Sequence, residues 1–256
     1  MIGYRIFSEN SMPSIVWGRH PQEAYDNPYE HEAQRQFLRE CDALLREIIK
    51  RLRPHTLKYH RDEQSLQKAT WLITMDLLAS LLDCVDLLKE TRHRPVARVF
   101  RDAVEAIDVM RFLHEDSPKA VSALKKWYQN ETISHGEIRK LIEAQDGAEA
   151  ATERRIFYQQ LSKFTHRTYR ALLHSVSLGR DDLMVHDSHG SGHLVLPQTI
   201  AAYMAVLGDI TIQASGSLSA TGLLSTDEVV EAWGAALEVH TVPRRFAIRF
   251  KPGSSL

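Results

Sequence analysis

Three sets of polar side chains recur at helical spacing along the chain, and together they have the chemistry needed for proton transfer. Residues four, seven or eight positions apart lie on one face of a helix. Carboxylate, imidazole and guanidinium groups that meet in one low-dielectric cleft can exchange protons and stabilise charge. The sets therefore form a functional pocket, a buried network that fixes helix register, or three solvated faces. They are Asp76, Ser80 and Asp83; Arg101 and Glu105; and Tyr158, Ser162 and His166.

A local excess of positive charge lies between residues 150 and 180. This stretch holds six Lys or Arg residues and a single acid, Glu153. Phosphate groups or an acidic partner would suit such a surface, and a merely solvated helix face is the alternative. Lys163 and Arg170 are the candidate RNA-binding residues of this stretch.

The histidines His186, His189 and His193 form a third candidate site. Closely spaced imidazoles resemble a metal-ligand set, so a metal-dependent enzyme is one of the functions considered. However, Gly and Ser separate these histidines, and no expected helix or strand fixes their geometry. We therefore expect no metal site and no cofactor.

Glycine and proline indicate which elements must position these residues. Only four of the 12 glycines occur in the first 178 residues. After Pro118, no proline occurs before Pro197. Because both residue types interrupt regular structure, the first two-thirds of the chain should form long helices. The sequence predicts an all-α bundle of about seven to eight helices.

Apolar residues at helical spacing and capping signals set the expected boundaries. The stretch 71–88 is apolar almost all round, which is typical of a buried central helix. Ser134 and Glu137 are spaced as a capping box, and Thr226 should cap the last helix. The expected helices span about 28–53, 62–90, 94–115, 118 onward, 134–147, 149–178, 197–214 and 226–236, and residues 2–6 and 246–250 alternate like the strands of a short terminal β-ribbon.

We accordingly divide the chain into an N-terminal arm (1–26), a helical bundle (27–214) and a C-terminal helix and tail (215–256). A Gly/Ser-rich stretch at 215–219 permits a hinge between the last two parts. Cys41 and Cys84 lie in apolar periodic stretches and should pack as small hydrophobic residues.

The composition excludes a protein that is held on nucleic acid or membrane by bulk positive charge. Lys plus Arg total 32 and Asp plus Glu total 33, which gives a formal net charge of −1. Three aspartates inside the apolar stretch 71–88 argue against a membrane span. The N-terminus shows no signal-peptide pattern, so we expect a cytoplasmic protein.

Two motifs resemble those of a family of bacterial helical domains of unknown function. They are Arg101-x-x-x-Glu105 and Tyr158-x-x-Leu161-Ser162-x-x-x-His166, and the resemblance covers about residues 65–215. This family is similar to the HEPN-like helical bundles, many of which are dimeric ribonucleases of toxin–antitoxin and phage-defence systems. In those nucleases an Arg and a His at the dimer interface promote attack of a ribose 2′-hydroxyl on the neighbouring phosphate without a metal. The resemblance therefore implies a homodimer that acts on RNA.

Arg167 and His174 match the spacing of that nuclease pair, with six residues between them. Two other Arg/His pairs in the chain match as well, which is the number that chance alone would produce. The position of Arg167 and His174 on the basic stretch favours them over the other two pairs. Thr168 stands where the nucleases usually carry Asn, Asp or His, which is a departure from the motif.

Two functions of different classes follow. In the first, the chain is a metal-independent ribonuclease or RNA-binding protein. His174 or His166 would then act as general base or acid, and Arg167 would stabilise the transition state, with Arg101 and Glu105 as further catalytic candidates. In the alternative, it is a non-catalytic interaction or sensor module with a protein partner. Its structural or ligand-holding network would consist of Arg101, Glu105, Tyr158, Ser162 and His166, with Asp76 and Asp83 as further candidates.

Overall fold

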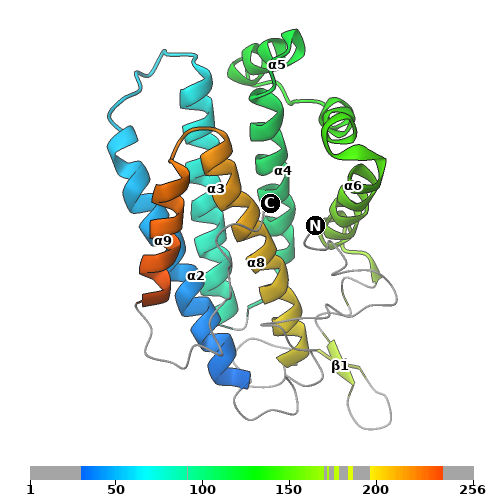
Figure 1. Ribbon diagram of the computed structural model, residues 1–256. Coiled ribbons are helices and arrows are strands. Elements are labelled where there is room, and N and C mark those ends of the chain that lie inside the picture. Colours follow the sequence, from blue (N-terminus) through cyan, green and yellow to red (C-terminus); the bar gives the residue numbers. More distant parts are fainter. Residues whose placement is uncertain are drawn as a thin grey trace.

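The fold is an all-α bundle, as the sequence predicts. The computed structural model describes residues 30–90, 92–169, 172, 176–178, 184–186 and 197–238. The expected terminal ribbon and the N-terminal arm lie outside this described part. Its seven α-helices are α2 (Glu30–Leu52), α3 (Leu66–Lys89), α4 (Val96–Leu113), α5 (Pro118–Tyr128), α6 (His135–Thr165), α8 (Pro197–Ala220) and α9 (Thr226–Glu238), and a 3-10 turn, η2 (Arg53–His55), follows α2 (Figure 1).

Helix α4 lies at the centre of the bundle, with α3, α6 and α8 packed around it. It buries nine residues, among them Phe100, Val104 and Met110. Helix α3 buries Leu77, Leu81 and other apolar residues, in agreement with its expected central position. It begins after Ser65, whose hydroxyl accepts a hydrogen bond from the Lys68 amide at 3.2 Å, and not at residue 62.

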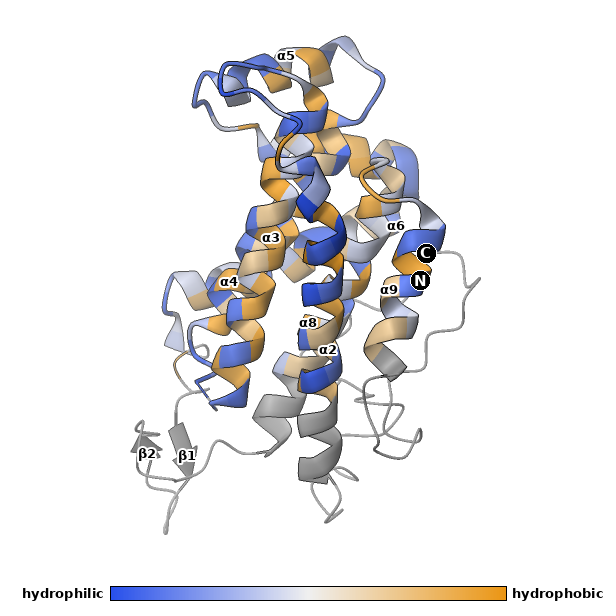
Figure 2. Ribbon diagram, turned by 90° about the vertical axis from the view of Figure 1, so that its left-hand side faces the viewer, coloured by the Kyte–Doolittle hydropathy of each residue, from blue (hydrophilic) through white to orange (hydrophobic). Residues whose placement is uncertain are grey.

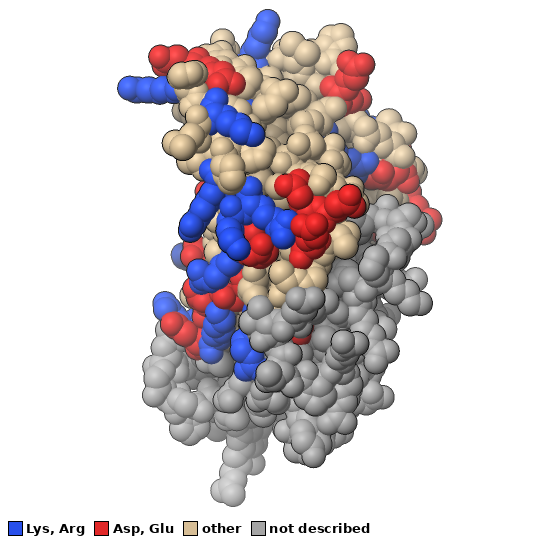
Figure 3. Space-filling model, turned by 60° about the vertical axis from the view of Figure 1, so that its left-hand side comes forward, with Lys and Arg blue, Asp and Glu red and all other residues tan. Residues whose placement is uncertain are grey.

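Helix α9 closes the bundle by packing against α2, so that the first and last described helices lie side by side (Figure 1). The outer side of α2 is mainly hydrophilic (Figure 2). Cations on this face stand beside acids (Figure 3), as in the pairs Arg46–Asp42, Lys89–Asp42 and Arg51–Glu231. Within the described residues, no helix is both long and apolar enough to cross a membrane.

The C-terminal boundary expected at 214/215 falls inside a helix. The Gly/Ser-rich stretch 215–219 forms part of the last turns of α8, which continue to Ala220. Ser215 is buried, and its hydroxyl donates to the Thr211 carbonyl one turn earlier at 2.8 Å. Helix α9 is capped by Ser225, and not by Thr226 as expected. The Ser225 hydroxyl accepts from the Glu228 amide at 3.2 Å, and the Glu228 carboxylate accepts from the Ser225 amide at 2.8 Å.

The prediction of one helix from 149 to 178 is wrong, because α6 ends at Thr165. Arg167 adopts a left-handed conformation with φ 53°. The Thr168 amide donates to the Lys163 carbonyl and the Arg167 amide to the Phe164 carbonyl, which is the bonding of a Schellman helix end. Residues Val176–Leu178 then form strand β1, which pairs antiparallel with β2 (Met184–His186). Arg167 and His174 therefore do not share one continuous helix.

Helix α6 breaks sharply at Gly147, where the sequence predicts that one helix stops before another begins. Gly147 has φ 90° and ψ 167°, a conformation that is almost exclusive to glycine. Arg111 on α4 stabilises the break through two hydrogen bonds. It donates to the Gln145 side chain at 2.7 Å and to the Asp146 carboxylate at 2.7 Å. The first half of α6 begins at His135 as expected, but the Ser134 side chain makes no capping hydrogen bond.

Replacement of Gly147 by Ala should destabilise the protein. The added methyl group meets no atom within 4 Å, so the cost comes from the backbone conformation alone. We expect a loss of about 1–3 kcal/mol in the free energy of unfolding, measured by urea denaturation. Gly136→Ala is the matched control, because Gly136 lies within the first turn of α6, and it should leave stability unchanged or raise it slightly. Equal effects of the two substitutions would contradict this account of the break.

Candidate functional site

Arg101 and Glu105 on α4 meet Tyr158 on α6, as the convergence hypothesis expects for these three residues. The Arg101 guanidinium donates to the Tyr158 hydroxyl from Nε at 3.0 Å and from Nη2 at 2.9 Å. The Tyr158 hydroxyl donates in turn to Glu105 Oε2 at 3.2 Å. The Arg101 Cζ atom also lies 5.2 Å from the centre of the Tyr158 ring, within range of a cation–π interaction.

His135 is a fourth member that sequence reasoning missed. Its Nε2 atom lies 3.1 Å from Glu105 Oε1 and 3.4 Å from the Tyr158 hydroxyl. In a straight helix, the 23 positions between His135 and Tyr158 would span about 35 Å. The break at Gly147 must therefore fold the two halves of α6 together, and no sequence spacing reveals this. We call Arg101, Glu105, His135 and Tyr158 the α4–α6 cluster.

The α4–α6 cluster is half-buried, which sets its electrostatics. The His135 side chain is 43% exposed and that of Glu105 is 35% exposed. Burial raises the pKa of the Tyr158 hydroxyl, and the negative charge of Glu105 adds to this, while Arg101 opposes it. The hydrogen bond to Tyr158 raises the pKa of Arg101, so the guanidinium stays positively charged. The cluster thus combines a fixed cation, a neutral phenol and an imidazole beside a carboxylate.

Asp76 and Asp83 make no described hydrogen bond or ion pair with this cluster, and the alternative of a solvated face describes them. Both residues are exposed on α3. The reason is that Leu77, Leu81 and the other apolar residues of α3 occupy the sides that face the bundle, which leaves the two aspartates on the remaining side.

The remaining candidates lie near the end of α6 or beyond it. The Ser162 hydroxyl donates to the Tyr158 carbonyl at 2.8 Å, and therefore serves its own helix. His166, Lys163 and Arg167 are exposed, and no hydrogen bond joins their described side chains to the α4–α6 cluster. Arg170 and His174 lie outside the described residues. Of the histidine-rich segment, His186 belongs to β2, while His189 and His193 also lie outside the described part.

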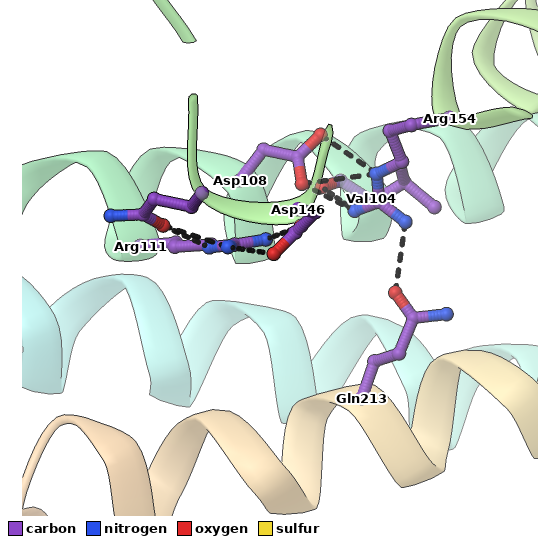
Figure 4. Close-up of polar contacts among 7 residues, drawn as sticks. Val104, Asp108, Arg111, Asp146, Arg154 and Gln213 are labelled. Carbon is purple, nitrogen blue, oxygen red and sulfur yellow. Dashed lines mark hydrogen bonds and ion pairs between the residues drawn. The ribbon is translucent and has the colours of Figure 1, made fainter. Parts of the chain in front are cut away.

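A second polar network lies deeper in the bundle, around Arg154 (Figure 4). The Arg154 side chain is 8% exposed and donates from Nε to both carboxylate oxygens of Asp108 at 3.0 Å. It also donates to the Val104 carbonyl at 3.2 Å and to the Gln213 side chain on α8 at 2.8 Å. One guanidinium therefore connects α4, α6 and α8.

Sequence reasoning placed Arg154 among the basic residues of a helix surface. Its position in the sequence predicts a buried side chain, because Arg154 precedes Phe157 by three residues and Leu161 by seven. Both of these residues are buried in the core, so Arg154 lies on the apolar stripe of α6.

Within the described residues, no group of three or more His, Cys, Asp or Glu side chains is placed to hold a metal ion. Comparison of the chain with protein-family models, curated proteins and solved structures finds no match. Any function assigned to the candidate site therefore rests on the geometry of its residues.

Arg154→Ala should strongly destabilise the bundle, because it leaves the Asp108 carboxylate largely buried without its cation. We expect a loss of about 3–5 kcal/mol in the free energy of unfolding. The matched control is Arg46→Ala, which breaks an exposed pair with Asp42 and should cost at most about 1 kcal/mol. Urea denaturation of the two variants and the unmodified protein measures both. A similar small loss in each would show that the Arg154 network does not stabilise the bundle.

Asp209 should make stability fall as pH rises. This α8 residue lies one turn before Gln213, and burial raises its pKa to about 7. Because the folded state then holds a proton that the unfolded state releases near pH 4, stability falls from about pH 4 and levels off above about pH 7. Between pH 5 and pH 8 the loss should be about 2–3 kcal/mol relative to Asp209→Asn, which cannot ionise. Parallel pH dependences of the two proteins in urea denaturation would refute this.

Proposed function

We propose that the α4–α6 cluster is the active site of a metal-independent RNA-cleaving protein. The observation that carries this proposal is the His135 imidazole, held 3.1 Å from the Glu105 carboxylate beside a hydroxyl that Arg101 contacts. A histidine oriented by a carboxylate is a recurrent proton acceptor in enzymes. The half-exposed position of the ring leaves it open to a substrate.

The residues of the cluster divide the chemistry of phosphodiester cleavage between them. With its Nε2 proton donated to Glu105, the His135 ring can accept the proton of a ribose 2′-hydroxyl at Nδ1. The 2′-oxygen then bonds to phosphorus, and the bond from phosphorus to the 5′-oxygen breaks. Arg101 supplies positive charge to the phosphorane-like transition state. Water protonates the 5′-oxygen to give the 5′-hydroxyl product, and the hydroxide so formed takes the proton from His135, which restores the neutral imidazole. The other product carries a 2′,3′-cyclic phosphate.

This proposal gives different roles to the residues of the nuclease-like motif. The pairing of Arg167 with His174 was motivated by one continuous helix, and α6 ends before Arg167. We therefore assign general-base catalysis to His135 and leave His166, Arg167 and His174 as secondary candidates. A homodimer, and a role in a bacterial defence or toxin system, remain parts of the proposal that rest on the resemblance alone.

The test is incubation of the protein with total RNA in excess EDTA. We expect cleavage that leaves 2′,3′-cyclic phosphate ends, because no metal takes part in the proposed reaction. His135→Ala should lower the rate by about 10²–10⁴-fold, which is typical for removal of a general base. His60→Ala is the control, because His60 lies in the exposed connection between α2 and α3. Intact RNA, or equal rates for both variants, would overturn the proposal.

The second candidate function is a non-catalytic interaction or sensor module. It is favoured by the way in which the cluster's polar groups bond to one another, as Arg101, Tyr158 and Glu105 do. In this case Arg101→Gln should weaken folding, while the unmodified protein leaves RNA intact in the same assay. RNA cleavage that Arg101→Gln abolishes without a change in the unfolding transition would exclude this second candidate.

A further inference from the structure

Three exposed cations lie on the outer side of α6 and at its end. Arg155, Lys163 and Arg167 are exposed, and none of them makes an ion pair within the described part of the chain. Arg46 and Lys89 on the α2 face are paired instead, each with Asp42 at 2.9 Å and 3.1 Å respectively. We call Arg155, Lys163 and Arg167 the α6 basic stripe.

The sequence between the first and last residues of the α6 basic stripe contains no acid. Residues 154–169 contain no Asp or Glu, and Glu153 is half-buried. Arg155 and Lys163 are eight residues apart, which is about 12 Å along the helix axis. Arg155 lies one turn before Tyr158, so the stripe begins beside the α4–α6 cluster and runs away from it.

Exposed apolar side chains occur in the same region. Tyr169 is 71% exposed, Leu172 is 52% exposed and Ile156 is 42% exposed. An exposed aromatic ring beside unpaired cations is the arrangement with which proteins bind single-stranded nucleic acid, because bases stack on the ring while cations contact the phosphates.

The left-handed conformation of Arg167 is a second observation that favours a functional role for its charge. It occupies the position of a Schellman motif that glycine usually fills, since glycine has no Cβ to oppose the left-handed conformation. Glycine at position 167 would therefore stabilise the helix end more than arginine does. Strained residues of this kind are concentrated at functional sites.

We propose that the α6 basic stripe and Tyr169 bind a single-stranded RNA segment next to the α4–α6 cluster. This deepens the proposed function and rests on it for the class of ligand. Three cations contact successive phosphates as the strand leaves the cluster, and Tyr169 stacks on a base. An acidic protein segment is the competing ligand, and it is disfavoured because cations and an aromatic ring together match both the phosphates and the bases of RNA.

The test measures binding without cleavage, by means of a fluorescein-labelled 2′-O-methyl oligouridylate that lacks the reacting hydroxyl. With three phosphate contacts, log K should fall against log[salt] with a slope of about −2. The combined variant Arg155→Gln, Lys163→Gln and Arg167→Gln should bring this slope close to zero and weaken binding at low salt. The matched control is Arg46→Gln, Lys50→Gln and Arg92→Gln, which removes three exposed cations that stand beside acids and should change neither slope nor affinity.

Three single variants separate the contributions. Tyr169→Ala should weaken binding about tenfold with the salt slope unchanged, and Tyr169→Phe should bind like the unmodified protein. Arg167→Gly should make the slope shallower by about 0.7 while the unfolding transition moves to higher urea concentration. That pair of effects distinguishes a phosphate contact from a residue needed only for folding.

No binding by the unmodified protein, or equal slopes for the stripe variant and its control, would overturn the inference. Displacement of the oligonucleotide by polyaspartate at equal charge concentration would overturn it as well, because the stripe would then be a surface for acidic protein segments. Binding with the expected slope by a protein that leaves total RNA intact would support the stripe and refute cleavage. His135→Ala should bind the oligonucleotide normally, which keeps the two proposals separable.

Discussion

The buried ion pair between Arg154 and Asp108 is the interaction on which the candidate site depends. A charge that is removed from water must be paired, so Arg154 can occupy the core only where Asp108 and the Val104 carbonyl meet it. This requirement fixes how far α6 can slide along α4. Tyr158 follows Arg154 by one turn on α6, and Glu105 precedes Asp108 by nearly one turn on α4. The same register therefore brings Tyr158 to Glu105 and Arg101.

The break at Gly147 supplies the second constraint. The first half of α6 packs Ile138, Leu141 and Ile142 into a small core with Phe112 and Leu113 at the end of α4. Arg111 fixes the break itself through Gln145 and Asp146. His135 is thereby held against Glu105 by packing and hydrogen bonds at both ends of the segment. One residue without a side chain thus lets a single helix contribute both the phenol and the imidazole of the site.

Sequence patterns predicted the all-α bundle and most of the core that the structure describes, because burial imposes a local period. The apolar stripe of α2 and the near-complete apolarity of α3 both depend on neighbouring residues only. Helix ends were predicted less well. Arg167 terminates α6 in a conformation usually taken by glycine, and Ser215 extends α8 by bonding back to its own backbone.

The candidate site was predicted in part, for related reasons. Arg101, Glu105 and Tyr158 carry a spacing signal, whereas His135 joins them only through the fold of α6. Arg154 was predicted to lie on the surface because only its charge was considered.

The closure of α2 by α9 has a consequence for synthesis of the chain. Trp233 and Ala236 face Phe37 and Leu44, so about 190 residues separate the two sides of that contact. At about 5–20 residues per second, a ribosome needs roughly 10–40 s to make the covering helix. During that interval the apolar side of α2 must be shielded by chaperones or by the helices already made.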